Sequence, residues 1–220
     1  MKLFLIRHGE STQNTKENYK IGLPDHKVYL TEHGKEEARL AGSFLKNYIE
    51  ENKIDTSNSI MWVSPYTRTR ETADIINKIL EIKKVKENIT LIEQRYGLFS
   101  DKEIETLKRK YPEQFSFYDN YYQNDGKFYA KLPQGESPFD VALRTKQFID
   151  TLYRDQKDVI FVVSHGTTIK TIVMNFLHYS PEWFNNEPTP ENCSIRLINA
   201  NDKLNTEEYI YNVPKKLIKR

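Results

Sequence analysis

An arginine, a histidine and a glycine follow the first apolar run of the chain. The run 3–6 has the pattern of a buried β-strand, and it stops at Arg7-His8-Gly9. A guanidinium offers a planar fork of donors suited to phosphate, and a neutral imidazole can act as a nucleophile. A glycine lets the backbone approach a ligand closely because it has no Cβ. Together these residue types point to phosphate chemistry.

Three further apolar runs are each followed by polar side chains that could join this chemistry. They are 60–63 followed by Arg68, 89–92 followed by Glu93, and 159–163 followed by His165 and Gly166. In open α/β sheets, ligands bind outside the carboxyl ends of the strands. We therefore expect two arginines, two histidines and one carboxylate to meet at one edge of a sheet.

Helical patterns separate these four expected strands. Helices are predicted over about 31–51, 66–80, 137–154 and 166–176, and two last strands over 194–198 and 207–211. Alternating strands and helices are typical of a mostly parallel sheet with helices on both faces. The prediction is an α/β fold with three layers (α/β/α) and a mostly parallel, mixed central sheet.

Residues 98–135 break this alternation. They are rich in aromatic and charged residues, with short helices predicted over 101–110 and 112–122. Long ordered insertions are often lids. We therefore expect one domain over 1–220 with a cap-like helical and loop insertion at about 98–135 over the active site. The aromatic stretch 115–129 is expected to form a wall of the substrate pocket.

Composition excludes several classes of function. The net charge is +2, from 33 basic and 31 acidic residues, so there is no global electrostatic case for nucleic acid. The single Cys193 excludes an intrachain disulfide framework and a cysteine-based zinc site. Lys2 and Arg7 interrupt the apolar N-terminus, so no signal peptide is expected, and no run approaches membrane-spanning length. We expect a cytoplasmic protein that does not bind membranes.

The motifs in this order resemble those of the histidine phosphatase superfamily, in its phosphoglycerate mutase-like branch. The matching stretches are Arg7-His8-Gly9-Glu10-Ser11 with Asn14, Leu30-Thr31 with Gly34, Ser64-Pro65 with Arg68 and Thr72-Ala73, Glu93 with Gly97, Gly135-Glu136-Ser137, and Ser164-His165-Gly166. The resemblance implies that His8 accepts a phosphoryl group and that Arg7, Arg68 and His165 bind its oxygens. It also implies that Glu93 is the proton donor.

Further residues could shape the substrate pocket, and these are Asn14, Ser11, Gly166, Arg95 and Tyr96. His8 must be neutral to attack, and its other ring nitrogen needs an acceptor such as a backbone carbonyl. No metal and no cofactor are expected, because positioned cations provide most of the catalysis of phosphoryl transfer.

The substrate is expected to be a small phosphorylated metabolite, and three functions stay open. We favour a metal-independent phosphomonoesterase that acts through a phosphohistidine. The second reading is a 2,3-bisphosphoglycerate-dependent phosphoglycerate mutase, but Gln13 stands where such mutases usually keep a tryptophan, and their paired arginines are missing from the insertion. The only basic residues expected near a second phosphate are Arg95 and Lys131. The third reading is an inactive phospho-ligand binding protein. A homodimer is a possible assembly.

Overall fold

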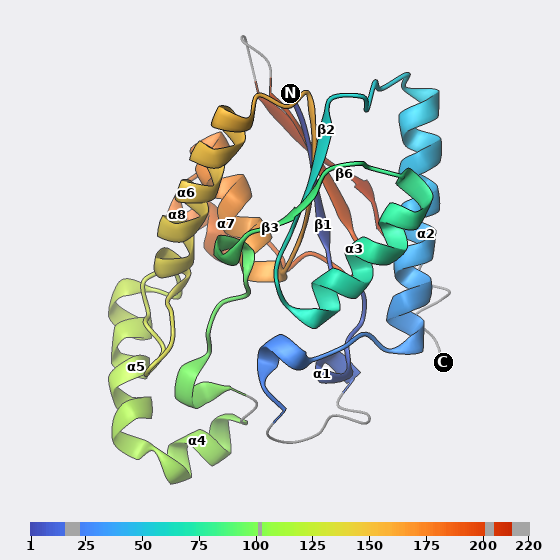
Figure 1. The fold of residues 1–220 in the computed structure, drawn as a ribbon. Helices are drawn as coiled ribbons and strands as arrows, with labels where there is room; N and C mark the ends of the chain where they lie inside the picture. Colours follow the sequence, from blue (N-terminus) through green and yellow to red (C-terminus); the bar gives the residue numbers. More distant parts are fainter. Residues whose placement is uncertain (16–22, 101–102, 201–204, 213–220) are drawn as a thin grey trace.

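The computed structural model describes residues 1–15, 23–100, 103–200 and 205–212 (Figure 1). Its strands are β1 (Lys2–Arg7), β2 (Ser59–Val63), β3 (Val85–Glu87), β4 (Val159–Ser164), β5 (Ile195–Asn199) and β6 (Thr206–Tyr211). Its α-helices are α1 (Thr12–Thr15), α2 (Glu32–Glu51), α3 (Thr67–Leu80), α4 (Ile104–Lys110), α5 (Pro112–Asp125), α6 (Pro138–Asp155), α7 (Gly166–Leu177) and α8 (Pro181–Asn186).

One six-stranded sheet forms the centre of the molecule, in the order β3-β2-β4-β1-β5-β6. The first four strands in this order run parallel, and β5 and β6 are antiparallel additions at one edge. In the register of β1 and β4, Leu5 lies beside Val162 and Arg7 beside Ser164. The carboxyl ends of these two central strands therefore lie side by side. The predicted mixed, mostly parallel α/β sheet is confirmed.

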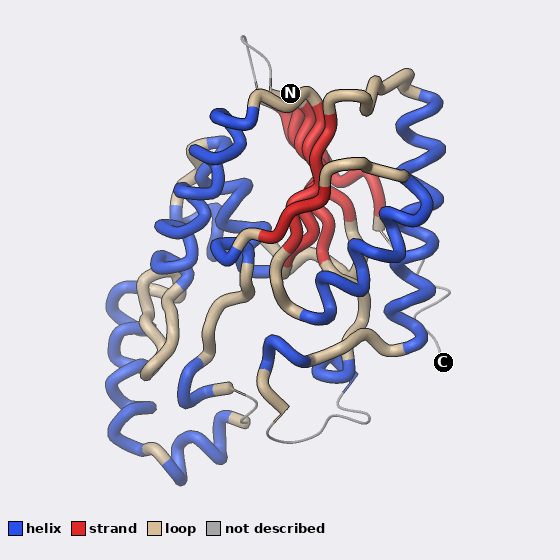
Figure 2. Tube along the Cα trace, viewed as in Figure 1, coloured by secondary structure: helices blue, strands red, loops and turns tan. Residues whose placement is uncertain are grey.

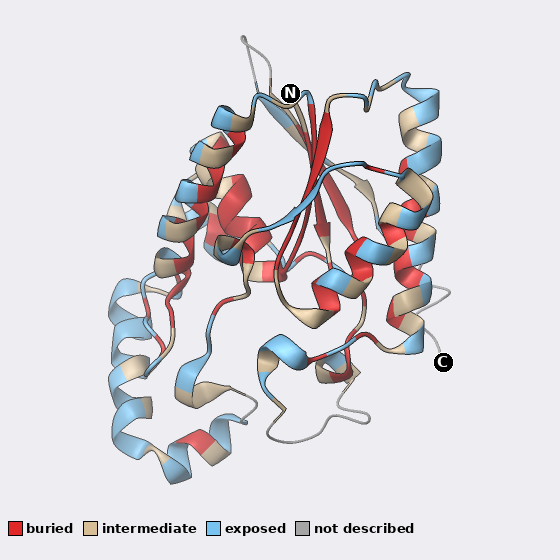
Figure 3. Cartoon of the chain, viewed as in Figure 1, coloured by how far each residue is buried: buried red, intermediate tan, exposed pale blue. Residues whose placement is uncertain are grey.

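Helices cover both faces of the sheet. Figures 1 and 2 show α2 and α3 on one face and α6, α7 and α8 on the other. Alternate residues of β1 point to opposite layers: Phe4 and Ile6 pack in the core with α2 and α3, and Leu3 and Leu5 pack in the core with α6 and α7. Figure 3 shows the buried sheet between helices whose outer faces are exposed. Burial on both faces explains why the sequence of these strands is almost continuously apolar.

The prediction of a strand over 89–92 is wrong. Residues Ile89–Leu91 form a turn of 3₁₀ helix, and the strand that pairs with β2 is the shorter, exposed β3 just upstream. The Asn88 side chain accepts hydrogen bonds from the backbone N–H of Thr90 at 2.9 Å and from its hydroxyl at 2.8 Å. Such a local bond turns the backbone away from the sheet ladder. The β-branched residues of this segment are therefore a weaker signal than the asparagine before them.

The insertion contains α4 and α5, which lie beyond the carboxyl ends of the parallel strands (Figure 1). The helix predicted over 112–122 is confirmed, and of the one predicted over 101–110 the structure shows Ile104–Lys110, since 101–102 lie outside the described residues. No residue of α5 is buried, but the rings of Phe115 and Tyr118 lie 6.1 and 5.3 Å from that of Phe99. None of the helices in the described ranges is long and apolar enough to cross a membrane.

Candidate active site

The pairing of β1 with β4 brings the two histidine motifs together. Arg7 pairs with Ser164, and the backbone N–H of His8 donates to the Ser164 carbonyl at 3.0 Å. His8 and His165 each come directly after their strand, and their ring centroids are 5.1 Å apart. Two motifs that are far apart in the sequence therefore form one site at the carboxyl edge of the sheet.

Gly9 is required by a contact between two backbones. A Cβ on Gly9 would lie 2.4 Å from the carbonyl oxygen of Gly34, and a Cβ on Gly34 would lie 2.0 Å from that of Glu10. Gly34 is in the first turn of α2, where its N–H donates to the Thr31 hydroxyl at 3.0 Å. The prediction that Gly9 makes room for a ligand therefore needs correction, since helix α2 fills the space beside it.

The His8 ring is buried and is held in one tautomer. Its Nδ1 lies 2.7 Å from the Gly9 carbonyl oxygen, which can only accept a hydrogen bond. Nδ1 therefore carries the proton, and Nε2 keeps its lone pair. Burial, together with the positive charges of Arg68 and Arg7, lowers the pKa of His8 well below its ordinary value. At neutral pH the ring is uncharged and has a free nucleophilic nitrogen.

Nitrogen NMR of the ¹⁵N-labelled protein is expected to show His8 as the neutral Nδ1–H tautomer at pH values well below the midpoint of its titration in the unfolded protein. Protonation would add a third positive charge to a buried site that already holds Arg7 and Arg68, so it needs a pH well below the roughly 6.5 at which an unperturbed histidine titrates. A His8→Asn variant assigns the signal, and the urea-unfolded protein gives the reference titration. Protonation of native His8 above that reference value would contradict the tautomer assignment.

His165 has one ring nitrogen engaged and one unpartnered. Its Nε2 lies 2.8 Å from the hydroxyl oxygen of Ser64 at the end of β2. Its Nδ1 is buried and has no hydrogen-bond partner among the described residues. Burial and the charge of Arg68 lower the pKa of His165 well below its ordinary value. A buried polar nitrogen without a partner costs roughly 1–3 kcal/mol, and a phosphate oxygen at this nitrogen would offset that cost.

Two arginines supply the positive charge, Arg68 buried and Arg7 partly buried. Arg7 Nη1 donates to the Pro190 carbonyl at 2.7 Å, and its Nε is a second buried donor for which the described part of the chain offers no partner. Arg68 Nη1 donates to the backbone carbonyl and to the carboxylate of Asp25, both at 2.8 Å. Arg68 also lies over the ring of Tyr66, 5.0 Å from its centroid. These contacts fix both guanidinium groups before any anion binds.

Replacing Arg68 by alanine is expected to lower kcat/KM for phosphate esters by about 10- to 150-fold. One charge-assisted hydrogen bond to a phosphate oxygen is worth roughly 1.5–3 kcal/mol, and each 1.4 kcal/mol is a factor of about ten. Arg70 on the same helix is the matched control, because it is exposed and pairs with Glu87 through two bonds of 2.7 Å. Arg70→Ala is expected to keep the rate within about twofold. A wild-type rate in Arg68→Ala would place Arg68 outside the site.

Glu93 reaches the site from a loop rather than from a strand end. Its Oε1 accepts from the backbone N–H of Gln94 at 2.8 Å, and its Oε2 accepts from that of Thr167 at 3.4 Å. A Cβ on Gly166 would lie 3.8 Å from Glu93 Oε2 and 3.9 Å from Arg7 Nε. The carboxylate therefore lies at the first turn of α7, close to the Arg7 guanidinium. The sequence predicts this position beside the site, but it wrongly predicts that a strand leads into Glu93.

An ion pair that sequence reasoning did not find holds the Glu93 loop. Arg144 on α6 donates to the carbonyl oxygens of Thr90 at 2.6 Å and of Glu93 at 3.1 Å. Its Nε lies 3.1 Å from the buried carboxylate of Glu136. Glu136 also accepts from the backbone N–H of Arg95 at 2.9 Å. The sequence signal was the Gly-Glu-Ser motif that contains Glu136, but nothing in it indicated Arg144 as the partner.

The five predicted pocket residues divide into two groups. Gly166 lies against Glu93 and Arg7, and Tyr96 lines a neighbouring cavity. Ser11 and Asn14 bond to each other instead, because Asn14 Oδ1 accepts from the Ser11 hydroxyl and backbone N–H, both at 2.9 Å. Arg95 is exposed, and its nearest carboxylate is that of Glu136 at 3.6 Å. The structure therefore brings Gly166 and Tyr96 to the site region and turns Arg95 toward Glu136. The Ser11–Asn14 pair lies just after His8 in the chain, and its contact with a phosphate stays a prediction.

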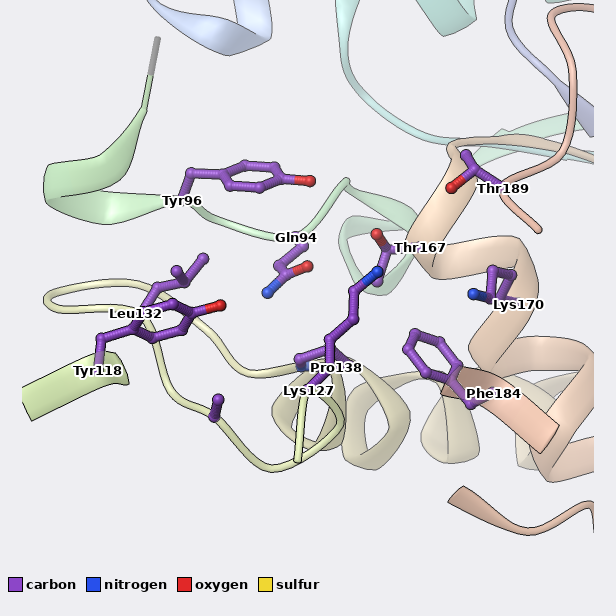
Figure 4. Close-up of a pocket in the computed structure, with 11 residues that line it drawn as sticks. Gln94, Tyr96, Tyr118, Lys127, Leu132, Pro138, Thr167, Lys170, Phe184 and Thr189 are labelled. Atoms are coloured by element: carbon purple, nitrogen blue, oxygen red, sulfur yellow. The ribbon is translucent and has the colours of Figure 1, made fainter. Parts of the chain in front are cut away.

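A cavity of about 160 Å³ lies beside the residues that flank Glu93 (Figure 4). Thr167, whose N–H contacts Glu93, and Gln94, the next residue after Glu93, both line it. Thr189 lines it as well and lies beside Gly166. The cavity therefore neighbours Glu93 and the first turn of α7. Burial and the charge of Glu93 raise the pKa of Tyr96 to about 12, so its hydroxyl stays protonated.

Comparison with known proteins identifies the family to which this fold and candidate site belong. The family model of the histidine phosphatase superfamily (branch 1) matches residues 3–212. The chain therefore belongs to the histidine phosphatase superfamily, as the sequence motifs predict.

Named relatives agree with this assignment. A phosphoglycerate mutase-like protein of Arabidopsis thaliana (AT74) is 32% identical over 212 residues, which cover 90% of this chain and 64% of that protein, just under two thirds of its length. Phosphoserine phosphatase 1 of Hydrogenobacter thermophilus is 30% identical over 173 residues, which cover 78% of this chain and 74% of that protein. The alpha-ribazole phosphatase of Shigella flexneri shares the fold, with a TM-score of 0.76 at 22% identity and 95% of both chains covered.

Proposed function

We propose that the protein hydrolyses small phosphomonoesters through a covalent phosphohistidine at His8, without a metal ion. One observation carries this proposal. The buried His8 ring is neutral, its Nδ1 proton is bound by the Gly9 carbonyl, and its Nε2 is free near the positive charges of Arg68, which is buried, and Arg7, which is partly buried. The unpartnered Arg7 Nε and His165 Nδ1 are nitrogens of the same site that lack an acceptor within the described residues. A phosphoryl group at this site would accept hydrogen bonds from Arg7 Nε and His165 Nδ1 and would be open to attack by His8 Nε2.

In the first step, His8 Nε2 attacks the phosphorus atom and the bond from phosphorus to the ester oxygen breaks. Negative charge spreads over the three equatorial oxygens, where Arg7, Arg68 and His165 would stabilise it. The departing oxygen takes a proton from the Glu93 carboxyl group, because an alkoxide is a poor leaving group. The products of this step are the free alcohol and the phosphohistidine.

In the second step, a water molecule gives a proton to the Glu93 carboxylate and attacks the phosphorus atom. The bond from phosphorus to His8 Nε2 breaks, and inorganic phosphate leaves. Glu93 ends the cycle protonated and His8 ends it neutral, so the protons balance. Arg144 would act through Glu93, since it holds the backbone carbonyl of that residue at 3.1 Å.

The charges of the site support catalysis without a metal. The two arginines supply positive charge for the transferred group, and neutral His165 can donate a hydrogen bond to it. The carboxylates that act on these arginines are Asp25, Glu93 and Glu37. Within the described ranges, no three histidine, cysteine, aspartate or glutamate side chains gather where they could hold a metal ion. The cap role of the insertion, the single-domain organisation, the homodimer and the cytoplasmic location stay predictions.

The mutase is the second candidate, because the adjoining cavity offers positive charge for a second phosphate. Arg95 and Lys131, the cations predicted for this role, do not line the cavity: Arg95 faces Glu136, and Lys131 pairs with Asp140 at 3.2 Å. The cavity is instead lined by Lys127 and Lys170. A mutase must also keep water from its phosphoenzyme, and the absence of buried residues in the described α5 favours access of water.

The purified protein is expected to release phosphate from a panel of phosphomonoesters and to keep this activity in excess EDTA. Vanadate should inhibit it as a mimic of pentacoordinate phosphorus. With 3-phosphoglycerate and a catalytic amount of 2,3-bisphosphoglycerate, free phosphate should appear faster than 2-phosphoglycerate. A colorimetric phosphate assay and an enolase-coupled assay measure the two rates.

Three outcomes would contradict the proposal, each in a different way. Activity lost on chelation and restored by a divalent ion would show a metal enzyme. Isomerisation about tenfold faster than hydrolysis would make the mutase the right assignment. Tight binding of phosphate esters with no turnover of any of them would leave the inactive binding protein as the function.

A further inference from the structure

The cavity beside the site has positive charge on two of its walls and no acidic residue in its lining. Its lining residues are Gln94, Tyr96, Tyr118, Lys127, Ala130, Leu132, Pro138, Thr167, Lys170, Phe184 and Thr189. Figure 4 shows Lys127 extending from its loop toward Thr167, while Lys170 enters from α7 above the ring of Phe184. The hydroxyl groups of Tyr96 and Tyr118 point into the same space (Figure 4).

Lys170 is a buried cation without a carboxylate of its own. Its Nζ donates to the backbone carbonyl of Glu187 at 2.6 Å and lies 4.1 Å from the centroid of the Phe184 ring. The Glu187 carboxylate is bound by Arg196 instead, at 3.0 Å. Buried charges are normally paired, and Lys170 forms no salt bridge within the described residues.

Lys127 adds a second positive charge near Lys170, which favours the binding of an anion between them. Burial and the nearby charge of Lys127 lower the pKa of Lys170 to about 8, so the two cations are close enough to repel each other. Lys127 is exposed and also has no carboxylate partner in the part of the chain that the structure describes. An anion between the two lysines would remove this repulsion and would pair both charges.

We propose that this cavity binds the leaving group of the substrate, and that the leaving group carries a second anionic group, a carboxylate or a phosphate, held by Lys127 and Lys170. The inference rests on the proposed phosphatase function, since Gln94 and Thr167 of the cavity lining flank Glu93, where the leaving oxygen would take its proton. It names the class of substrate as phosphate esters of small hydroxy compounds with a second negative charge.

The dimensions of the cavity suit a leaving group of a few carbon atoms. A cavity of roughly 150 Å³ can hold one benzene ring, and this one has about 160 Å³. Of the seven aromatic residues in 115–129, only Tyr118 lines this cavity. The expectation that the aromatic stretch forms a wall for a larger, less charged leaving group is therefore corrected in favour of a short anionic one.

The test compares esters that share a three-carbon chain with a hydroxyl group on its middle carbon and differ in the group at the far end. Glycerol 3-phosphate is neutral there, 3-phosphoglycerate carries a carboxylate, and glycerol 1,3-bisphosphate carries a phosphate. We expect kcat/KM for one or both anionic esters to exceed that for glycerol 3-phosphate by about tenfold or more. The ester with the larger gain identifies the anion as carboxylate or phosphate.

Lys127→Met and Lys170→Met should remove this preference through KM, while p-nitrophenyl phosphate and glycerol 3-phosphate keep rates within about twofold of wild type. Lys127 is exposed, so its variant is expected to fold even if removal of the buried Lys170 disturbs α7. Lys131→Met is the control from the same loop, because its side chain pairs with Asp140 outside this cavity. It should keep the preference for anionic esters.

Failure of this inference differs from failure of the proposed function. If wild type hydrolyses p-nitrophenyl phosphate and glycerol 3-phosphate but gains nothing from a second anion, the anion site is wrong and the phosphatase stands. If Lys127→Met lowers the rates of all substrates equally, its role is structural and the inference is also overturned. If no ester is hydrolysed, the proposed function itself is wrong.

Discussion

Replacing His8 by alanine is expected to abolish the phosphoenzyme and to lower turnover by roughly four orders of magnitude or more, as loss of a nucleophile does in other enzymes of covalent mechanism. His8 Nε2 is the free ring nitrogen beside Arg7 and Arg68, because Nδ1 is bound to the Gly9 carbonyl. Its removal takes away the atom that forms the covalent bond. Incubation with a ³²P-labelled ester, followed by an alkaline quench, should trap an acid-labile adduct in wild type only.

His178→Asn is the matched control for the loss of a histidine. His178 is exposed at the end of α7 and has a φ of 57°, a conformation that asparagine tolerates. This variant should keep both the adduct and the rate. An acid-labile adduct that persists in His8→Ala would assign the nucleophile to another residue, and an alkali-labile adduct would exclude a phosphohistidine.

Replacing Glu93 by glutamine is expected to slow alkyl phosphate esters by roughly 100-fold or more, the usual effect of losing a general acid. The same change should slow p-nitrophenyl phosphate far less, since its phenolate leaves with little help from a proton. Glutamine keeps an oxygen that can accept from the Gln94 N–H, now 2.8 Å from Glu93 Oε1, so the loop should stay in place. Steady-state rates for glycerol 3-phosphate and p-nitrophenyl phosphate measure the difference.

The comparison of the two leaving groups separates proton transfer from positioning. Glu105→Gln is the control, because Glu105 lies in the first turn of α4 and its side chain contacts only Lys108 within the described residues. It should not change either rate by more than about twofold. Equal slowing of both esters in Glu93→Gln would assign Glu93 a positioning role and would leave the proton donor to be found.

The central sheet could be predicted from the sequence because its strands are buried on both faces. β1, β2 and β4 are short, continuous apolar runs that end abruptly, and each lies within a residue or two of its predicted bounds. The exposed strand β3 has the sequence Val-Lys-Glu and carries no such signal. Its pairing with β2 depends on the sheet that already exists, which a single sequence does not reveal.

The candidate site likewise contains residues that could be predicted from the sequence and residues that could not. Arg7, His8 and His165 could be predicted because the end of a parallel strand has one place in the fold, and the register of β1 with β4 brings these ends together. Lys170 could not be predicted as a site residue, because a single lysine in the apolar helix α7 does not indicate that its side chain faces a cavity. Arg95 was predicted to shape the substrate pocket, but its side chain faces Glu136, a residue 41 positions further along the chain.

The residues proposed to bind the phosphoryl group and the residues that line the cavity come largely from different parts of the chain, so they can change independently. Arg7 and His165, two of the proposed phosphoryl-binding residues, lie at strand ends, and the contact of Gly9 with Gly34 there leaves no space for a larger side chain. Part of the cavity wall comes from Tyr118 and the loop residues 127–132, outside the sheet. Substitutions in that wall can change which alcohol is released while the reacting atoms keep their geometry. Selectivity can therefore drift by point mutation within an unchanged catalytic frame. Recombination of the insertion would carry Lys127 between relatives but not Lys170, which lies on α7.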